Sequence, residues 1–151
     1  MSGQENEASA SFSAIIGKES RTGGHAAFAA NYKTNARYKN TATFGVGTVS
    51  NFLGQFVVGR ANLDTTKNDL KNTDLNTALF VVGNGKADDG TSFDTNATEY
   101  NINIRSTSNT YRSNAFMVFS DGRARIGKEP TADMDVVNLA YLKNYLLDKE
   151  W

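Results

Sequence analysis

The feature that most constrains this chain is a short apolar block that recurs through its first sixty residues. The block occupies residues 13–17, 27–30, 43–45 and 56–59, and each copy ends in a small residue. These closing residues lie 13, 15 and 14 positions apart: Gly17, Ala30, Gly45 and Gly59. A further copy at 79–83 follows after 24 positions. A period near 14 predicts a β-solenoid whose turns each carry two short strands, with alternate side chains pointing inward.

The segments between the blocks are rich in Gly, Ser, Thr and Asn, which suits tight turns. A single coil of this kind has a thin interior, so it is expected to share its apolar side chains with neighbouring chains. An alternative from the same residues is an ordinary β-sandwich with chance spacing, because regularly spaced strands are also typical of sandwiches.

Three segments follow the repeats. Residues 60–77 are polar and are interpreted as a loop inserted into the coil. Residues 84–129 contain an alternating stretch at 100–105 and two alternating stretches joined by Asp121-Gly122, which predicts a small antiparallel hairpin domain. Residues 131–149 predict a helix, with Thr131 or Asp133 as its cap and one apolar face. That helix either packs back on its own sheet or bundles with the same helix of other chains.

Bulk composition limits the function classes. Sixteen Lys and Arg balance sixteen Asp and Glu, so a neutral chain has no broad attraction to nucleic acid. There is no cysteine, no apolar run of about 18 residues that could cross a membrane, and no basic-then-apolar export signal. We therefore expect no membrane insertion and no nucleic-acid partner.

No catalytic or metal site stands out. His25 is the single histidine, and the acids at 88–89 and 94 lack the spacing of a calcium loop. Asp94 and Glu99 are the candidate pair for polysaccharide hydrolysis, but nothing in the sequence marks them as buried. Residues 83–86 lack the spacing of a phosphate loop. The sequence predicts no enzyme and no cofactor.

A weaker binding hypothesis concerns the hairpin region. Arg123 and Arg125 fall on one face of a predicted strand, and together with Tyr100 and Tyr111 they are candidates for contact with an anionic glycan or nucleic acid. A solvated sheet face or ion pairs between chains explain the same residues. Arg112 is interpreted as structural.

Several motifs resemble a known class of proteins. The first repeats resemble the head repeats of trimeric autotransporter adhesins of the YadA type. GQFVVGRAN at 54–62, ALFVVGNG at 78–85 and RSNAF at 112–116 with Asp121-Gly122 then follow in that order. This succession is similar to a module of phage tail and baseplate structural proteins, and PTADMDVVN at 130–138 resembles the link that ends many tail-fibre domains.

The resemblance implies a mainly β, trimeric fold: a YadA-like left-handed parallel β-roll over 11–83, a small antiparallel sheet over 84–129 and a C-terminal helix over 131–149. The residues expected in the core shared by the trimer are Ile16, Phe28, Phe44, Val58, Val82, Phe116, Val136, Leu139 and Leu146. The sequence departs from the adhesin pattern in its irregular spacings and in aromatic residues, such as Phe28 and Phe44, where small ones are common.

The implied function is that of a structural and adhesive segment of a phage tail fibre or receptor-binding appendage. Its partners would be two further copies of itself, other tail or baseplate proteins and a glycan or other receptor on the host surface. It would be assembled in the bacterial cytoplasm and displayed on the virion tail. The alternatives are the head of a bacterial trimeric surface adhesin and a polysaccharide-degrading tail spike.

Overall fold

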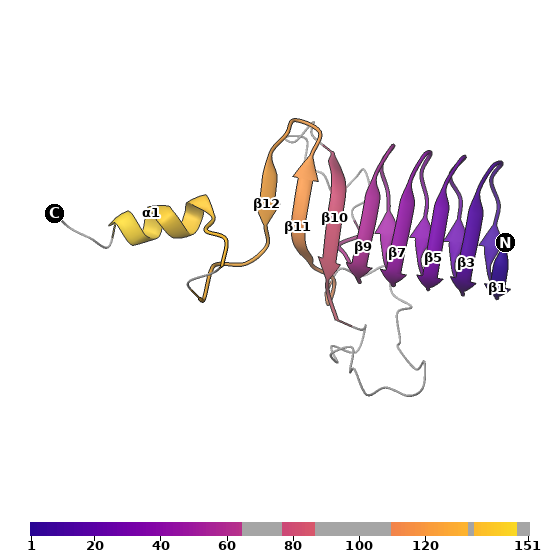
Figure 1. Ribbon diagram of the computed structural model, residues 1–151, viewed down its shortest axis with the longest axis horizontal. Helices are drawn as coiled ribbons and strands as arrows, with labels where there is room; N and C mark the ends of the chain where they lie inside the picture. Colours follow the sequence, from indigo (N-terminus) through magenta and orange to yellow (C-terminus); the bar gives the residue numbers. More distant parts are fainter. Residues whose placement is uncertain (65–76, 87–109, 133–134, 148–151) are drawn as a thin grey trace.

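The repeats form a parallel β-solenoid, and the chain leaves it through two antiparallel strands and a helix (Figure 1). The computed structural model describes residues 1–64, 77–86, 110–132 and 135–147. A turn of the solenoid is called a rung, and each of the first four rungs has one long strand and one short strand. The described chain is therefore mainly β, as predicted.

Two sheets run along the solenoid. The long strands build an eight-stranded sheet, called sheet A: β1 (Ser2–Gln4), β3 (Ala14–Lys18), β5 (Phe28–Tyr32), β7 (Ala42–Val46), β9 (Phe56–Arg60), β10 (Ala78–Asn84), β11 (Asn114–Phe119) and β12 (Ala124–Ile126). The short strands build a four-stranded sheet, called sheet B: β2 (Glu7–Ala8), β4 (Arg21–Thr22), β6 (Asn35–Ala36) and β8 (Val49–Ser50).

The strand register shows a uniform period of 14 residues from β1 to β9. Gly17 pairs with Asn31, and Asn31 pairs with Gly45, so the predicted spacings of 13, 15 and 14 are corrected. The unequal spacings came from counting Ala30 as the closing residue of its block, although Asn31, the next residue, occupies the column of Gly17 and Gly45. Asn31 has φ 84°, and asparagine tolerates this left-handed conformation better than most residues with a side chain.

Gly45 explains why this column of the solenoid favours glycine. Its φ is 116°, and a Cβ added there would lie 1.8 Å from the carbonyl oxygen of Gly59 on the next rung. The backbones of successive rungs therefore approach more closely here than a side chain allows.

The interior of the coil is narrow and partly polar. Ile15 is 1% exposed whereas its neighbour Ile16 is 58% exposed, which confirms that alternate side chains point inward. Small hydroxyl residues fill much of the remaining space and bond within the coil. The Thr34 Oγ1 hydroxyl donates to Ser20 Oγ at 3.0 Å, and Ser20 Oγ donates to the carbonyl oxygen of Asn31 at 3.0 Å. This interior offers little apolar burial per rung.

The solenoid begins earlier than predicted and includes part of the segment assigned to the inserted loop. Its first rung begins at Ser2 rather than at residue 11. Residues 60–64, assigned from the sequence to an inserted loop, belong to the coil, and Ala61, Asn62 and Asp64 are buried. The rest of that insertion, 65–76, lies outside the described residues. Phe56 pairs with Phe80, which lies 24 positions later in the chain. β10 therefore continues the parallel order of the strands after a turn that is ten residues longer than the 14-residue period.

The strands after β10 extend sheet A instead of forming a sheet of their own. β11 pairs antiparallel with β10, and β12 pairs antiparallel with β11. The Asp121-Gly122 turn joins β11 and β12 at the position expected from the sequence. Residues 87–109, including the strand predicted at 100–105, lie outside the described part of the chain.

The C-terminal helix is shorter than predicted. Helix α1 (Leu139–Leu147) begins eight residues after the expected start, and Asn138 caps it by accepting the backbone N–H of Tyr141 at 2.8 Å. The predicted cap Thr131 instead gives its backbone N–H to the Asp135 carboxylate at 2.7 Å, which closes a separate turn. The other predicted cap, Asp133, and residues 148–149 lie outside the described residues.

Helix α1 lies beyond β12 along the stacking direction of the strands (Figure 1). It contacts no described strand, so the alternative in which it packs back on its own sheet is not observed. Among the described residues, no helix is long and apolar enough to cross a membrane.

Candidate oligomer interface and polar cap

The outer side of sheet A carries a continuous apolar surface, which we call the apolar face. Because register partners point to the same side of a sheet, strand pairing places side chains of successive rungs in columns along this surface. Its main members are Ile16, Phe28, Phe44, Phe56, Val58, Phe80, Val82, Phe116, Val118 and Ile126.

Five phenylalanine rings form a ladder on the apolar face. The ring centroids are 5.3 Å apart from Phe28 to Phe44 and from Phe44 to Phe56. The next two steps, to Phe80 and then to Phe116, measure 5.8 and 6.3 Å. These are ordinary contact distances for aromatic pairs. The ladder crosses from the parallel rungs to the antiparallel strand β11, so the face is one surface.

The structure brings six of the residues predicted for a shared core onto this face: Ile16, Phe28, Phe44, Val58, Val82 and Phe116. None of the six is buried inside the coil. Sequence reasoning missed Phe56 and Phe80, although alternation from Val58 and Val82 would have placed them on the same side. Val136, Leu139 and Leu146 lie in the C-terminal segment and are exposed.

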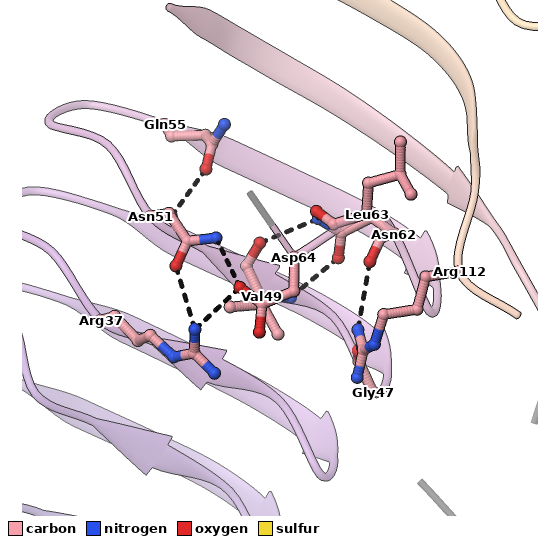
Figure 2. Close-up of polar contacts among 9 residues, drawn as sticks. All are labelled: Arg37, Gly47, Val49, Asn51, Gln55, Asn62, Leu63, Asp64 and Arg112. Atoms are coloured by element: carbon pink, nitrogen blue, oxygen red, sulfur yellow. Dashed lines mark hydrogen bonds and ion pairs between the residues drawn. The ribbon is translucent and has the colours of Figure 1, made fainter. Parts of the chain in front are cut away.

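The end of the solenoid is closed by polar side chains, which we call the polar cap: Asn62, Asp64, Arg112 and Asn114. Figure 2 shows the first three of them. The Asn62 amide takes the place of a further strand next to β8. Its Oδ1 accepts the Val49 N–H at 2.8 Å, and its Nδ2 donates to the Val49 carbonyl at 2.9 Å. Asn62 thus satisfies the edge of sheet B, which would otherwise leave unpaired backbone groups.

Arg112 fastens the later part of the chain to the coil. Its side chain is buried, and Nη1 donates to the carbonyl oxygens of Gly47 and Asn62 at 2.9 and 3.1 Å (Figure 2). Two residues later, Asn114 Oδ1 accepts the Leu63 N–H at 2.9 Å. The RSNAF motif therefore carries a cap for the solenoid, in agreement with the structural role inferred for Arg112.

Asp64 completes the cap on the side of sheet B. Its carboxylate accepts Arg37 Nη1 at 2.8 Å and Asn51 Nδ2 at 3.0 Å, and the backbone N–H of Asn51 donates to Gln55 at 2.8 Å (Figure 2). These contacts tie three consecutive rungs together before the chain enters residues 65–76.

Of the four residues predicted to contact a glycan, the structure brings Arg123 and Arg125 together and places Tyr111 apart from Arg123. The guanidinium groups of Arg123 and Arg125 both lie over the Phe119 ring, at 5.4 and 5.2 Å from its centroid. The Arg123 side-chain hydrogen bond also lowers the pKa of the Asp121 carboxyl. Tyr111 precedes β11 whereas Arg123 follows it, so the two lie at opposite ends of that strand. Tyr100 lies outside the described residues.

Of the remaining histidine and acid candidates, His25 lies within the described residues and the acids do not. His25 packs edge-on against Phe12, with ring centroids 5.3 Å apart. Within the described ranges, no group of three acids or histidines is placed to hold a metal ion. The acidic candidates at 88–89, 94 and 99 lie outside those ranges.

Three comparisons with known proteins were made, against family models, curated proteins and solved structures, and none returned a match.

Proposed function

We propose that this chain is a structural and adhesive segment of a phage tail fibre or receptor-binding appendage, and that it works as a homotrimer. In this proposal the three chains pack their apolar faces around one threefold axis. Other tail or baseplate proteins hold the fibre on the virion, and the bacterial surface glycan or another receptor is its target.

The apolar face is the observation that carries the proposal. A ladder of five Phe rings with Ile16 and Val58 beside it is larger than the scattered apolar residues of an ordinary monomer surface. The coil interior consists largely of small and hydroxyl residues, whereas five Phe side chains gather on the apolar face. Burying one Phe or Val side chain contributes roughly 1.5–3 kcal/mol before entropy is subtracted.

The motifs behind the tail-protein resemblance also have coherent places in the fold. The VVG stretches of 54–62 and 78–85 are adjacent parallel strands, and RSNAF supplies the cap through Arg112 and the antiparallel continuation through Phe116. A trimer would present every surface contact three times, and such multivalency can raise binding by about 10²–10⁴. That gain suits a protein that attaches to a repetitive cell surface.

Light scattering coupled to size-exclusion chromatography tests the assembly. The expected mass is three times the chain mass of 16.4 kDa, or about 49 kDa. A folded β protein that elutes at 16.4 kDa at micromolar concentration would overturn the proposal.

A pair of matched variants locates the interface. Phe44→Asp places a charge on the apolar face, and we expect it to abolish the 49 kDa species. Phe12→Asp makes the same change at a corner of the coil where the ring is 87% exposed, and we expect the trimer mass to persist. Equal loss of the trimer in both variants would contradict this assignment of the interface.

Attachment itself is tested with bacterial cells. Fluorescently labelled protein is expected to bind host cells, and binding should weaken strongly in Phe44→Asp because the multivalent gain is lost. Tail genes beside the coding sequence favour the virion assignment, whereas a membrane anchor on the natural chain favours the bacterial adhesin.

A further inference from the structure

An open groove lies where the apolar face meets the C-terminal segment. One wall is formed by Phe116 and Ile126 of β11 and β12, and the other by Val136 and Val137 ahead of α1 and by Leu139, its first residue. The Phe80–Phe116 ring contact makes the first wall the end of the apolar face. The groove is thus continuous with the proposed trimer interface.

The second wall is strongly exposed even though it is apolar. Val136, Val137 and Leu139 are 67, 53 and 65% exposed, and no described strand covers them. Three adjacent exposed apolar side chains beside an apolar groove are typical of a surface that another body covers.

Threefold symmetry restricts what that body can be. The rungs stack along the long axis of the molecule, and α1 lies beyond β12 on the same axis (Figure 1). A rotation about an axis parallel to this direction leaves every residue at its own axial level. The groove lies at the axial level of residues 136–139. Side chains that a neighbouring copy brings to the groove must therefore come from that level and not from the distal part of α1.

Charged residues of opposite sign lie at the groove and next to the apolar segment. Arg125 lines the groove on the β12 side, whereas Asp135, which directly precedes Val136, lines a neighbouring pocket together with Lys128 and Glu129. Asp135 accepts backbone N–H groups from Thr131 and Ala132, and these bonds lower the pKa of its carboxyl. Opposite charges on two different surfaces suit a head-to-tail contact between identical copies, which is the type that closes into a ring.

We infer that residues 136–139 of one protomer fill the groove beside β12 of the next, so that the three C-terminal segments interlock where the helices begin. This inference rests on the proposed trimer and specifies a contact within it. Val137 is the central residue, because it lies on the exposed wall between the other two apolar residues of the segment.

Disulfide trapping between two single variants tests the contact, because the chain contains no cysteine. Chains carrying Ile126→Cys are mixed with tagged chains carrying Val137→Cys, refolded together and oxidised. A two-chain covalent band that contains both the tag and the untagged chain is expected on a non-reducing gel. Chains with Leu53→Cys, at an exposed corner of the coil, replace Ile126→Cys as a control and are expected to give no such band.

Each outcome decides one question. Absence of the mixed band from a protein that still elutes near 49 kDa overturns the interlock and leaves the trimer intact. The same holds if Val137→Cys chains cross-link only with each other, because the segments would then meet at the axis. A protein that elutes at 16.4 kDa removes both the trimer and the interlock.

Discussion

At the scale of single residues, the solenoid depends on a few backbone positions that most side chains cannot occupy. Gly3, Gly45 and Gly59 share one column with positive φ, and Asn31 replaces glycine in that column with φ 84°. The positions two residues after Gly3 and Asn31, which are Glu5 and Lys33, also have positive φ but keep side chains. Positive φ alone therefore does not demand glycine, and glycine is favoured where the next rung also approaches closely.

This distinction predicts unequal effects of two alanine substitutions. Gly45→Ala should lower the free energy of unfolding by about 3 kcal/mol or more, because the new Cβ meets the Gly59 carbonyl in addition to the left-handed backbone. Gly54→Ala, with φ 70° and open space around the new Cβ, should cost only about 1 kcal/mol. Chemical denaturation of both variants measures the difference, and equal losses would contradict the close approach of the rungs.

Asp135 gives a second prediction at this scale. Two backbone N–H groups lower the pKa of its carboxyl, so the charged form stabilises the turn at Thr131 and Ala132. The stabilisation is present above the ordinary pKa of 3.8 and is lost as the pH falls through the lowered value. We expect the amide resonances of Thr131 and Ala132 to shift together below pH 3.8. Asp135→Asn should remove that titration, and a midpoint above 3.8 would contradict the assignment.

At the scale of elements, the polar cap decides where parallel stacking ends in sheet B. Asn62→Leu keeps a similar volume but leaves the Val49 N–H and carbonyl without their partners. Each buried unsatisfied group costs about 1–3 kcal/mol, so the variant should unfold at clearly lower denaturant concentration. Hydrogen exchange of the Val49 amide should also accelerate. Ser113→Ala removes an exposed bond to Asn84 and serves as the control, for which little change is expected.

The sequence specified these elements unevenly. The alternation around Ile15 and Ile16 and the Asp121-Gly122 turn depend on neighbours in the chain, so both could be predicted. The cap could not, because Arg112 reaches Gly47 across 65 positions and Asn62 imitates a strand with its side chain. The one local signal for the cap was Asn62, a polar residue in the column of Ser20, Thr34 and Thr48, whose side chains all point inward.

At the scale of the whole molecule, stability should depend on concentration if the apolar faces are shared. Binding between copies stabilises the folded state by mass action, so the melting temperature should rise when the protein concentration is raised a hundredfold. A melting temperature independent of concentration, in a sample whose mass changes on dilution, would contradict a shared core.

The composition of the apolar face was predictable from the repeat, but its continuity onto β11 was not, because it depends on the antiparallel pairing of Val82 with Phe116.

The uniform register also means that every repeat adds the same length to the solenoid. Each set of 14 residues adds one strand spacing, about 4.8 Å, to the length. Deleting residues 28–41 would place β7 beside β3 in sheet A. Equivalent residues would still pair, because Phe28 and Ala42 occupy the same position in consecutive rungs. The distance between the two ends of the molecule can therefore change in whole steps, by gain or loss of coding repeats, without any redesign of the contacts at either end.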